Sequence, residues 1–421
     1  LWIKSRSNAQ DHMLIDSVQG GNSLLRVNTT AATRTDYTWI DSFDADGFSY
    51  NSNLISSGYT YVAWCWEAGG TPTADNSAGA GATPTAGSVK IDGSNLGSAL
   101  AGTIPATKIS ANTARGFSIV GYEATGSAGT IAHGLSAAPE LIIVKHRDQS
   151  GTSWPVYYGD NTDAMYLNSN GATSDDANAW NDTTPTSTVF SVGANGGDTN
   201  NSSGGSTIAY CFHSVSGYSK IGTFTGNGGS QAIDVGFEPA WVMLRRTNGG
   251  TWGIFDSLRG NSGSDRNLQM LAANSTATET TNSQMTFSGN TFNDNGYLSD
   301  NGTTVLYMAF ADTREAAFFK DVTTNGNHFT PVNLDYRDSV PDTPTNNFAT
   351  FNPLNSPAAA VLSEGNTKFT QTSNDRAAIG NMAMSSGKWY YEVYYTAGSN
   401  PEAGLARIQD SFANSGATGS S

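Results

Sequence analysis

Residues 139–145 read PELIIVK, and residues 239–245 read PAWVMLR. A short apolar run that follows a proline and ends at a basic residue is typical of a buried β-strand. The chain opens on a third copy of this run, LWIKSR at residues 1–6. The sequence therefore predicts that one β-module is repeated along the chain.

Further apolar runs accompany each copy. A second run follows at residues 12–17, 153–158 and 251–257, and a closing run ends each unit at 62–66, 208–212 and 306–310. Two copies also share an opening run, GFSIVGY at 116–122 and GYSKIGTF at 217–224. The first copy has no such run before it, so we interpret the sequence as starting inside its first module, with the true N-terminus missing.

The runs are short and are bounded by Asn-Gly and Gly-Gly turns, a pattern typical of β-sandwiches. We expect an all-β fold of tandem, jelly-roll-like β-sandwich modules. The expected boundaries are module one at 1–68, a Gly/Ala/Thr/Pro-rich linker or arm at 69–114, module two at 115–216, module three at 217–313, a connector at 314–345 and an incomplete β segment at 346–421. Residues 265–273 are the one stretch with a possible helical turn. Modules two and three should place residues 141–144 and 241–244 on equivalent strands, with Cys211 in register with Ala309.

The composition excludes several classes of protein. A net charge of −15 disfavours a nucleic-acid binder, because neutralising phosphates needs clustered Lys and Arg. No stretch approaches the roughly 18 apolar residues that membrane insertion requires. The 9 Trp, 17 Tyr and 18 Phe can build cores, so the low charged content of 14% does not indicate disorder.

The two cysteines, Cys65 and Cys211, lie in the closing runs of two successive modules. Equivalent core positions of separate modules should lie too far apart for a disulfide, which needs a Cα separation below about 7 Å. We expect both thiols to be reduced, buried and distant from each other.

The search for catalytic and metal-binding patterns finds none of the common motifs. The five histidines are scattered, and we expect them to face solvent or cap turns rather than to bind metal: they are His12, His133, His146, His213 and His328. The sequence therefore predicts no enzyme, no metal and no cofactor.

Acidic pairs in polar loops could in principle act as the two carboxylates of a glycoside hydrolase. The pairs are Asp160 with Asp163, Asp175 with Asp176, and Asp44 with Asp46. Turn chemistry is the favoured interpretation, because Asp side chains bond the local backbone in such loops. A calcium site of Asp41, Asp44, Asp46 and Asn51 is the alternative. Residues 43–48 resemble residues 292–297, where Asn replaces two of the Asp, and this favours a hairpin turn.

Aromatic side chains in polar loops could stack on sugar rings. The candidate glycan-binding residues are Trp180, Trp154 and Tyr157, and Trp180 is the one expected to be exposed. Alternating aromatic residues of the closing runs, at 64, 66, 210 and 212, should instead fill cores.

Three stretches carry a resemblance to known families. Residues 342–354, DTPTNNFATFNPL, and 386–393, SGKWYYEV, resemble the entry to SPRY-like domains in tail-fibre-type proteins of bacteriophages, marine phages especially. Residues 139–145 with 210–212 resemble the β-repeat that precedes that domain in the same proteins. The loop NGNHFT at 325–330 is similar to one common in laminin-G-like jelly rolls.

This resemblance implies a non-enzymatic structural protein of a phage virion, a tail fibre or related appendage. It implies an extracellular, virion-bound location and contacts with other virion proteins. We expect weak binding of a host-surface glycan or receptor through exposed loops of modules two and three, and a homo-oligomer that is trimeric by resemblance. Two alternatives remain open: a component of a tail-associated polysaccharide depolymerase, and a secreted bacterial adhesin or lectin.

Overall fold

The computed structural model describes residues 1–44, 47–194, 198–200, 205–259, 268–281, 285–296, 298, 300–311 and short stretches between 349 and 404. The chain divides into two compact units, residues 1–312 and 313–421. In the second unit, β27 (Ala360–Ser363) pairs with β28 (Lys368–Gln371) in an antiparallel sheet. The connector at 314–345, which includes His328, lies outside the described residues, as does most of the SPRY-like stretch 386–393.

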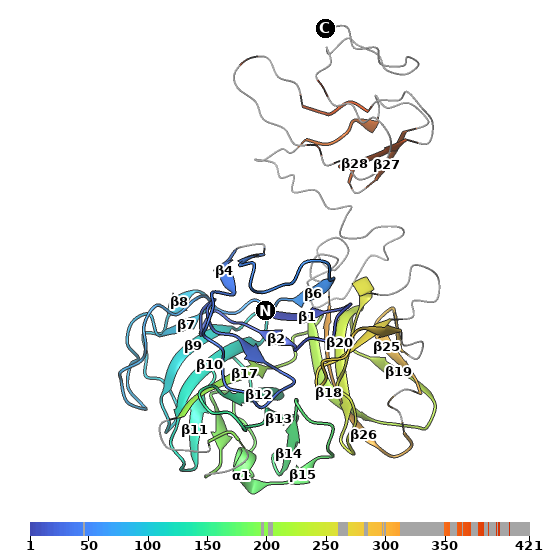
Figure 1. The fold of residues 1–421 in the computed structure, drawn as a ribbon. Coiled ribbons are helices and arrows are strands. Elements are labelled where there is room, and N and C mark those ends of the chain that lie inside the picture. Colours follow the sequence, from blue (N-terminus) through green and yellow to red (C-terminus); the bar gives the residue numbers. More distant parts are fainter. Residues whose placement is uncertain are drawn as a thin grey trace. The chain divides into compact units, whose positions relative to one another are not determined.

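The first unit is all-β, as predicted, and each module contributes one inner sheet, which is antiparallel except for the parallel pair β7–β9 of module 2 (Figure 1). Module 1 has the strand order β3–β2–β1–β6, with β1 at Trp2–Ser5, β2 at Met13–Leu14, β3 at Leu25–Arg26 and β6 at Tyr61–Trp64. Module 3 has the order β18–β26–β20–β21–β22–β23, with β18 at Ser219–Thr225, β20 at Pro239–Arg246, β21 at Gly253–Asp256, β22 at Gln269–Ala272, β23 at Thr280–Thr281 and β26 at Thr304–Ala311. Of the stretch 265–273, for which a helical turn is possible from the sequence, residues 269–272 form strand β22, and residues 265–267 lie outside the described residues.

The inner sheet of module 2 has the same central order within a larger sheet, β15–β14–β13–β12–β17–β10–β9–β7–β8. Its strands are β7 at Val89–Ile91, β8 at Ser94–Asn95, β9 at Ala106–Asn112, β10 at Phe117–Ala124, β12 at Leu141–His146, β13 at Pro155–Tyr157, β14 at Asp163–Tyr166, β15 at Ser174–Asp175 and β17 at Gly205–Phe212.

The predicted register between modules is confirmed. Ile142 pairs with Cys211 in module 2, and Val242 pairs with Ala309 at the equivalent place in module 3. Cys211 and Ala309 therefore occupy equivalent positions, and β12 and β20 are equivalent strands.

The prediction of a linker at residues 69–114 is wrong, because this stretch is folded into module 2. Strand β9 pairs with β10, and Leu100 and Ile109 are buried in the core of the module. Small residues permit close packing here: a Cβ at Gly69 would lie only 1.9 Å from the carbonyl oxygen of Ala111. The Gly- and Ala-rich composition thus reflects close backbone approach rather than an extended arm.

An outer sheet packs over each inner sheet, which makes each module a sandwich. The outer strands are β4 (Ile40–Phe43) and β5 (Phe48–Tyr50) in module 1, β11 (Gly129–Ala132) and β16 (Val189–Val192) in module 2, and β19 (Ser230–Asp234), β24 (Met285–Ser288) and β25 (Thr291–Asn295) in module 3. Each module has its own apolar core, and module 2 adds a short helix, α1 (Ala177–Trp180).

The hairpin prediction for residues 43–48 is supported, but its alignment with module 3 was shifted. Phe43 pairs with Phe48 across the turn, and Phe287 pairs with Phe292 in the same way. Residues 43–48 therefore correspond to 287–292, whereas residues 292–295 lie within strand β25. Asp44 accepts a hydrogen bond from the Ser49 hydroxyl near this turn, and Asp46 lies outside the described residues.

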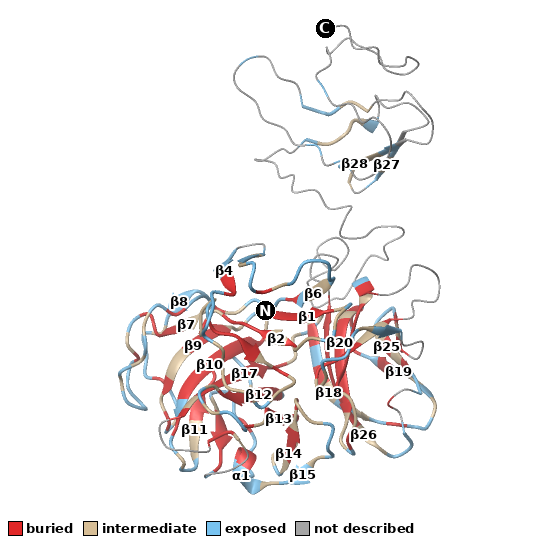
Figure 2. Ribbon diagram, viewed as in Figure 1, coloured by how far each residue is buried: buried red, intermediate tan, exposed pale blue. Residues whose placement is uncertain are grey.

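A fourth core joins the three modules. It contains side chains from all of the inner sheets, including Trp64, Tyr210, Trp241 and Phe310. The ring of Trp66 lies 5.4 Å from that of Trp241 and 6.4 Å from that of Phe212. Buried residues accordingly concentrate on the inner sheets (Figure 2). The aromatic residues of the closing runs do fill a core, as predicted, and that core is shared.

Candidate binding pocket at a seam between modules

Three basic residues occupy one register position in the three inner sheets. Lys4 lies opposite Val62, Lys145 opposite Ile208, and Arg245 opposite Leu306. All three are fully buried. Burial lowers the pKa of Lys4 and of Lys145 to about 8, and the pKa of Arg245 to about 10.

Each of these cations donates hydrogen bonds to backbone carbonyls of a neighbouring module. Lys4 donates to Thr276, Lys145 donates to Thr30, and Arg245 donates to Tyr166, Ser169 and Gly171. Module 1 therefore donates hydrogen bonds to module 3, module 2 donates to module 1, and module 3 donates to module 2. The three contacts run in one rotational sense and close a ring.

Backbone hydrogen bonds join the same three pairs of modules, with donation in the opposite direction around the ring. The amide of Thr33 donates to the carbonyl of Arg147 at 2.7 Å, and that of Thr173 donates to Thr247 at 2.8 Å. The amide of Glu279 closes the ring by donating to the carbonyl of Arg6 at 2.9 Å. The three seams between modules are thus built on one plan.

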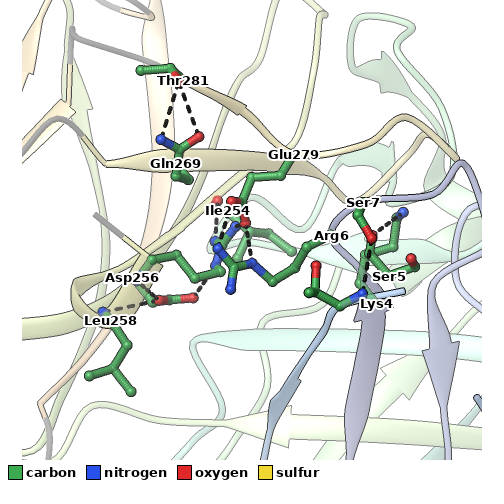
Figure 3. A network of polar contacts seen from close by, with 12 residues as sticks. Lys4, Ser5, Arg6, Ser7, Ile254, Asp256, Leu258, Gln269, Glu279 and Thr281 are labelled. Atoms are coloured by element: carbon green, nitrogen blue, oxygen red, sulfur yellow. Dashed lines mark hydrogen bonds and ion pairs between the residues drawn. The ribbon is translucent and has the colours of Figure 1, made fainter. Parts of the chain in front are cut away.

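The seam between modules 3 and 1 also carries an ion network (Figure 3). Glu279 bridges Arg6 and Arg259, with contacts of 2.8 and 3.1 Å. Arg259 also contacts Asp256 at 2.5 Å, and the indole N–H of Trp64 donates to Asp256 at 2.9 Å. The hydrogen bonds from both arginines keep the pKa of Glu279 below its usual value, although burial acts in the opposite direction as the largest single cause.

A related acid–donor pair closes the seam between modules 1 and 2. The hydroxyl of Tyr210 donates to the buried Asp16 at 2.7 Å. Asp16 follows strand β2, and Asp256 occupies the equivalent position at the end of β21. Tyr210 occupies the position in β17 that Trp64 occupies in β6. At the seam between modules 2 and 3, Tyr158 occupies the position of the acid and Met308 occupies the position of the donor. Both side chains belong to the shared core. A buried acid is therefore present where the neighbouring module offers a donor.

A pocket of about 580 Å³ opens at the seam between modules 2 and 3. Its lining consists of Ser, Thr and Asn residues: Ser153, Asn168, Ser169, Asn170, Thr251, Asn274 and Ser275. This volume lies within the range of roughly 300–1,000 Å³ that is usual for small-molecule sites. Its polar, uncharged lining distinguishes it from a typical apolar ligand cavity.

The repeat positions the pocket residues in equivalent pairs. The side-chain oxygen of Asn168 accepts a hydrogen bond from the amide of Trp154 at 2.9 Å, and Asn274 accepts one from Trp252 at 3.1 Å. Arg245 fixes the loop of module 2 by its bonds to the Ser169 and Gly171 carbonyls. Trp154 and Trp252 are fully buried, so the pocket walls rest on rigid apolar anchors.

Several polar groups of the pocket remain available for a ligand. Among the described residues, the side chains of Ser153, Asn170 and Thr251 have no hydrogen-bonding partner in the protein. They supply two hydroxyl groups and one carboxamide, each of which can donate and accept hydrogen bonds. The pocket can therefore bind a neutral ligand that is rich in hydroxyl groups.

The glycan-binding residues predicted from the sequence do not form this site. Trp154, Tyr157 and Trp180 are all buried, and the prediction that Trp180 is exposed is wrong. Asp176 caps helix α1 by accepting from the amide of Asn178, and the helix places Trp180 5.6 Å from the ring of Tyr157. The repeated dipeptides Asn168-Ser169 and Asn274-Ser275 were the sequence signal for the pocket.

The aspartates that were weighed as carboxylate pairs act within turns or strands. Asp160 accepts a hydrogen bond from the amide of Thr162, and Asp176 is the N-cap of α1. Asp163 accepts from the hydroxyl of Tyr158, and Asp175 lies in β15. Within the residues described, no three His, Cys, Asp or Glu side chains are grouped as metal ligands.

The four described histidines are buried rather than solvent-facing, whereas the alternative expectation, that histidines cap turns, holds for His133: the four are His12, His133, His146 and His213. The Nδ1 of His12 accepts a hydrogen bond from the indole of Trp2, and the Nδ1 of His133 accepts from the amide of Leu135. Burial, the largest cause in each case, lowers the pKa of His12 to about 3 and that of His133 to about 4.

His12 and His133 should make the fold sensitive to mild acid. An unfolded histidine binds a proton below about pH 6.5, whereas the folded ones remain neutral to about pH 4, so stability falls as the pH drops through this window. We expect the free energy of unfolding to decrease by up to about 2 kcal/mol per histidine between pH 7 and 5. Urea unfolding at both pH values measures it. The variant His12→Asn keeps an acceptor for the indole of Trp2, and its stability should fall only about half as much between pH 7 and pH 5. A fall as large as that of the parent chain would contradict the role of His12 in the acid sensitivity.

The two thiols are free, as expected, but only Cys211 is buried. Cys65 is exposed, contrary to prediction. Cys211 lies in β17, which is flanked by β10 and β12. Cys65 directly follows β6, which pairs with β1 on one side and, in the described part of the chain, with no strand on the other.

The fold and the pocket define an all-β protein in which three sandwich modules close on a common core. Residues 1–89 and 91–314 match the family model described as a domain of unknown function, DUF7483. The match spans more than half of the sequence, so the chain belongs to the DUF7483 family. No curated protein and no solved structure matches the chain. No helix in the described residues is long and apolar enough to cross a membrane.

Proposed function

We propose that this chain is a non-enzymatic structural protein of a bacteriophage virion, a tail fibre or related appendage, that contacts a neutral host-surface glycan. The observation that supports the binding step is the pocket between modules 2 and 3. Its seven lining residues present hydroxyl and carboxamide groups and no ionisable side chain. Such a lining suits the hydroxyl groups of a sugar and lacks a general acid or base for cleaving one.

The virion context is supported by the resemblance of residues 139–145, 210–212 and 342–354 to phage tail-fibre-type proteins. The other partners would be virion proteins, and assembly would be homo-oligomeric, with a trimer implied by the same resemblance. Several copies of a weak site on one virion would gain affinity through avidity. An uncharged pocket with few anchoring groups is compatible with weak individual sites.

Binding of host capsule or lipopolysaccharide oligosaccharides to the full chain tests the proposal. Asn170→Ala and Thr251→Val remove pocket groups that have no partner within the described protein, so each should weaken binding about tenfold, which corresponds to about 1.4 kcal/mol. Calorimetric titration measures this change. Asn178→Ala, on the exposed surface of module 2, is the matched control and should leave affinity unchanged.

Two outcomes would contradict the proposal. Release of oligosaccharide by the chain would favour the depolymerase alternative. Equal affinity in Asn170→Ala, Thr251→Val and the parent chain would show that the pocket does not bind the glycan.

A further inference from the structure

A second pocket, of about 330 Å³, lies at the seam between modules 1 and 2. Module 1 contributes Val18 and Gln19 to its lining. Module 2 contributes the other lining residues, which are Asp75, Thr107, Lys108, Gly121, Glu123, Arg147 and Ser206. Unlike the pocket between modules 2 and 3, this pocket contains ionisable side chains of both signs.

The repeat shows that the fold does not require charges at this place. Glu123 in β10 lies opposite Ser206 in β17, and the amide of Arg147, directly after β12, donates to the carbonyl of Ser206. In module 3 the equivalent row consists of three threonines, Thr225, Thr304 and Thr247. Uncharged residues therefore suffice to form this end of the sheet.

A glycine opens the floor of the pocket. Gly121 lies opposite Ile208, and the equivalent residue of module 3, opposite Leu306, is Thr223. The φ angle of Gly121 lies outside the left-handed region, so the backbone does not require glycine. A Cβ at Gly121 would lie 3.0 Å from the hydroxyl oxygen of Thr107. A larger side chain would therefore occupy space that glycine leaves open.

A chain of hydrogen bonds that starts in the shared core holds the guanidinium group of Arg147. The hydroxyl of Tyr210 and the side-chain amide of Gln19 both donate to Asp16, at 2.7 and 2.6 Å. Arg147 donates from Nε to the side-chain oxygen of Gln19 at 2.8 Å and from Nη1 to the hydroxyl of Ser206 at 3.3 Å. Both side-chain partners are neutral, so Arg147 is positioned without an ion pair in the described part of the chain.

Glu123 is an anion without a partner. Its side chain is exposed and forms no hydrogen bond or ion pair with any described residue. Strand β17 separates β10 from β12, so at the usual strand spacing the backbones of Glu123 and Arg147 are about 10 Å apart. The remaining two charges do pair, since Lys108 contacts Asp75 at 3.2 Å. The pocket thus presents an unpaired cation and an unpaired anion on either side of Ser206.

We propose that this pocket binds a small zwitterion, with an ammonium group that pairs with Glu123 and a carboxylate or phosphate group that pairs with Arg147. The free edge of the guanidinium group, Nη1 and Nη2, can form two parallel hydrogen bonds to either acidic group. Binding requires no internal ion pair to be broken, because neither side chain has an ionic partner among the described residues. This inference is independent of the proposed glycan binding, which concerns another seam.

Calorimetric titration of the full chain with 4-aminobutyrate and with phosphoethanolamine tests the proposal. Both probes carry an ammonium group, and they differ in the acidic group, so the comparison distinguishes a carboxylate ligand from a phosphate ligand. At least one of them should bind about tenfold or more tightly than butylamine, butyrate and inorganic phosphate, each of which lacks one of the two charges. The affinity should fall as salt is added, because Glu123 is exposed.

Two substitutions locate the binding. Glu123→Gln should weaken it about tenfold or more without affecting the fold, because the carboxylate has no partner among the described residues. Gly121→Thr, which copies Thr223 of module 3, should abolish binding by filling the pocket. Glu238→Gln, at an exposed carboxylate of module 3, is the matched control and should leave the affinity unchanged. Thermal unfolding shows whether each variant is folded.

Three results would overturn the proposal. The first is failure of both zwitterions to bind at about 10 mM, a concentration that detects millimolar dissociation constants. The second is binding of the single-charge compounds as tight as that of the zwitterions. The third is an affinity of Glu123→Gln equal to that of the parent chain, because the zwitterion would then bind elsewhere.

Discussion

Replacing Arg259 by Met should lower the free energy of unfolding of the first unit by about 3–5 kcal/mol, the usual cost of breaking a buried ion pair. The side chain of Arg259 is 2% exposed, and it contacts Asp256 and Glu279, which are 8% and 13% exposed. Methionine would leave Asp256 buried with only the indole N–H of Trp64 and local amides as partners. Urea unfolding, followed by tryptophan fluorescence, measures the change.

Arg34 provides the matched control for this substitution. It forms an ion pair with Asp36 in which the two side chains are 39% and 47% exposed. Solvent screens such a pair, so Arg34→Met should cost at most about 1 kcal/mol. Adding Asp256→Leu to Arg259→Met should recover part of the lost stability, because the unpaired charge is removed. Equal effects of the Arg259 and Arg34 substitutions would contradict the buried network.

Replacing Arg245 by Met should destabilise the first unit by about 3 kcal/mol or more. The substitution removes three hydrogen bonds from a charged donor to the carbonyl groups of Tyr166, Ser169 and Gly171, and a hydrogen bond to a charged group contributes about 1.5–3 kcal/mol. It also removes a cation that lies 5.2 Å from the ring centre of Trp252. Thermal and urea unfolding measure this loss.

The chain itself supplies the conservative comparison. Lys4 and Lys145 occupy the position of Arg245 in the other modules, so Arg245→Lys should retain a cation and part of the hydrogen bonding. We expect this variant to lose less than half of the stability that Arg245→Met loses. If lysine and methionine are equally destabilising, the carbonyl contacts do not account for the role of Arg245.

Local patterns were sufficient to predict the repeat and the register of its shared strands, but not strands β7–β9 within residues 69–114. The equivalence of Cys211 and Ala309 could be predicted because strand pairing within a module uses one local pattern. The turn roles of Asp160 and Asp176 could be predicted because an Asx side chain bonds the backbone two residues away.

Contacts between modules could not be predicted in this way. Lys4 lies near the end of strand β1, a place where a basic residue usually faces solvent, but its partner Thr276 lies 272 residues away in the sequence. Trp180 stands in a polar loop, and only the burial of helix α1 against Tyr157 reverses its expected exposure. The pocket depends on contacts between modules, since its two halves belong to different modules.

The central claim is that three modules form one closed ring and unfold together. Native-state hydrogen exchange of the full chain, compared with its Arg245→Met variant, tests this claim most directly. Arg245 lies in module 3 and contacts module 2, so a closed ring should transmit its loss to module 1 as well. We predict that the slowest amides of β1, β17 and β26 lose the same free energy of protection. Loss of protection in β17 and β26 with unchanged protection in β1 would contradict the ring.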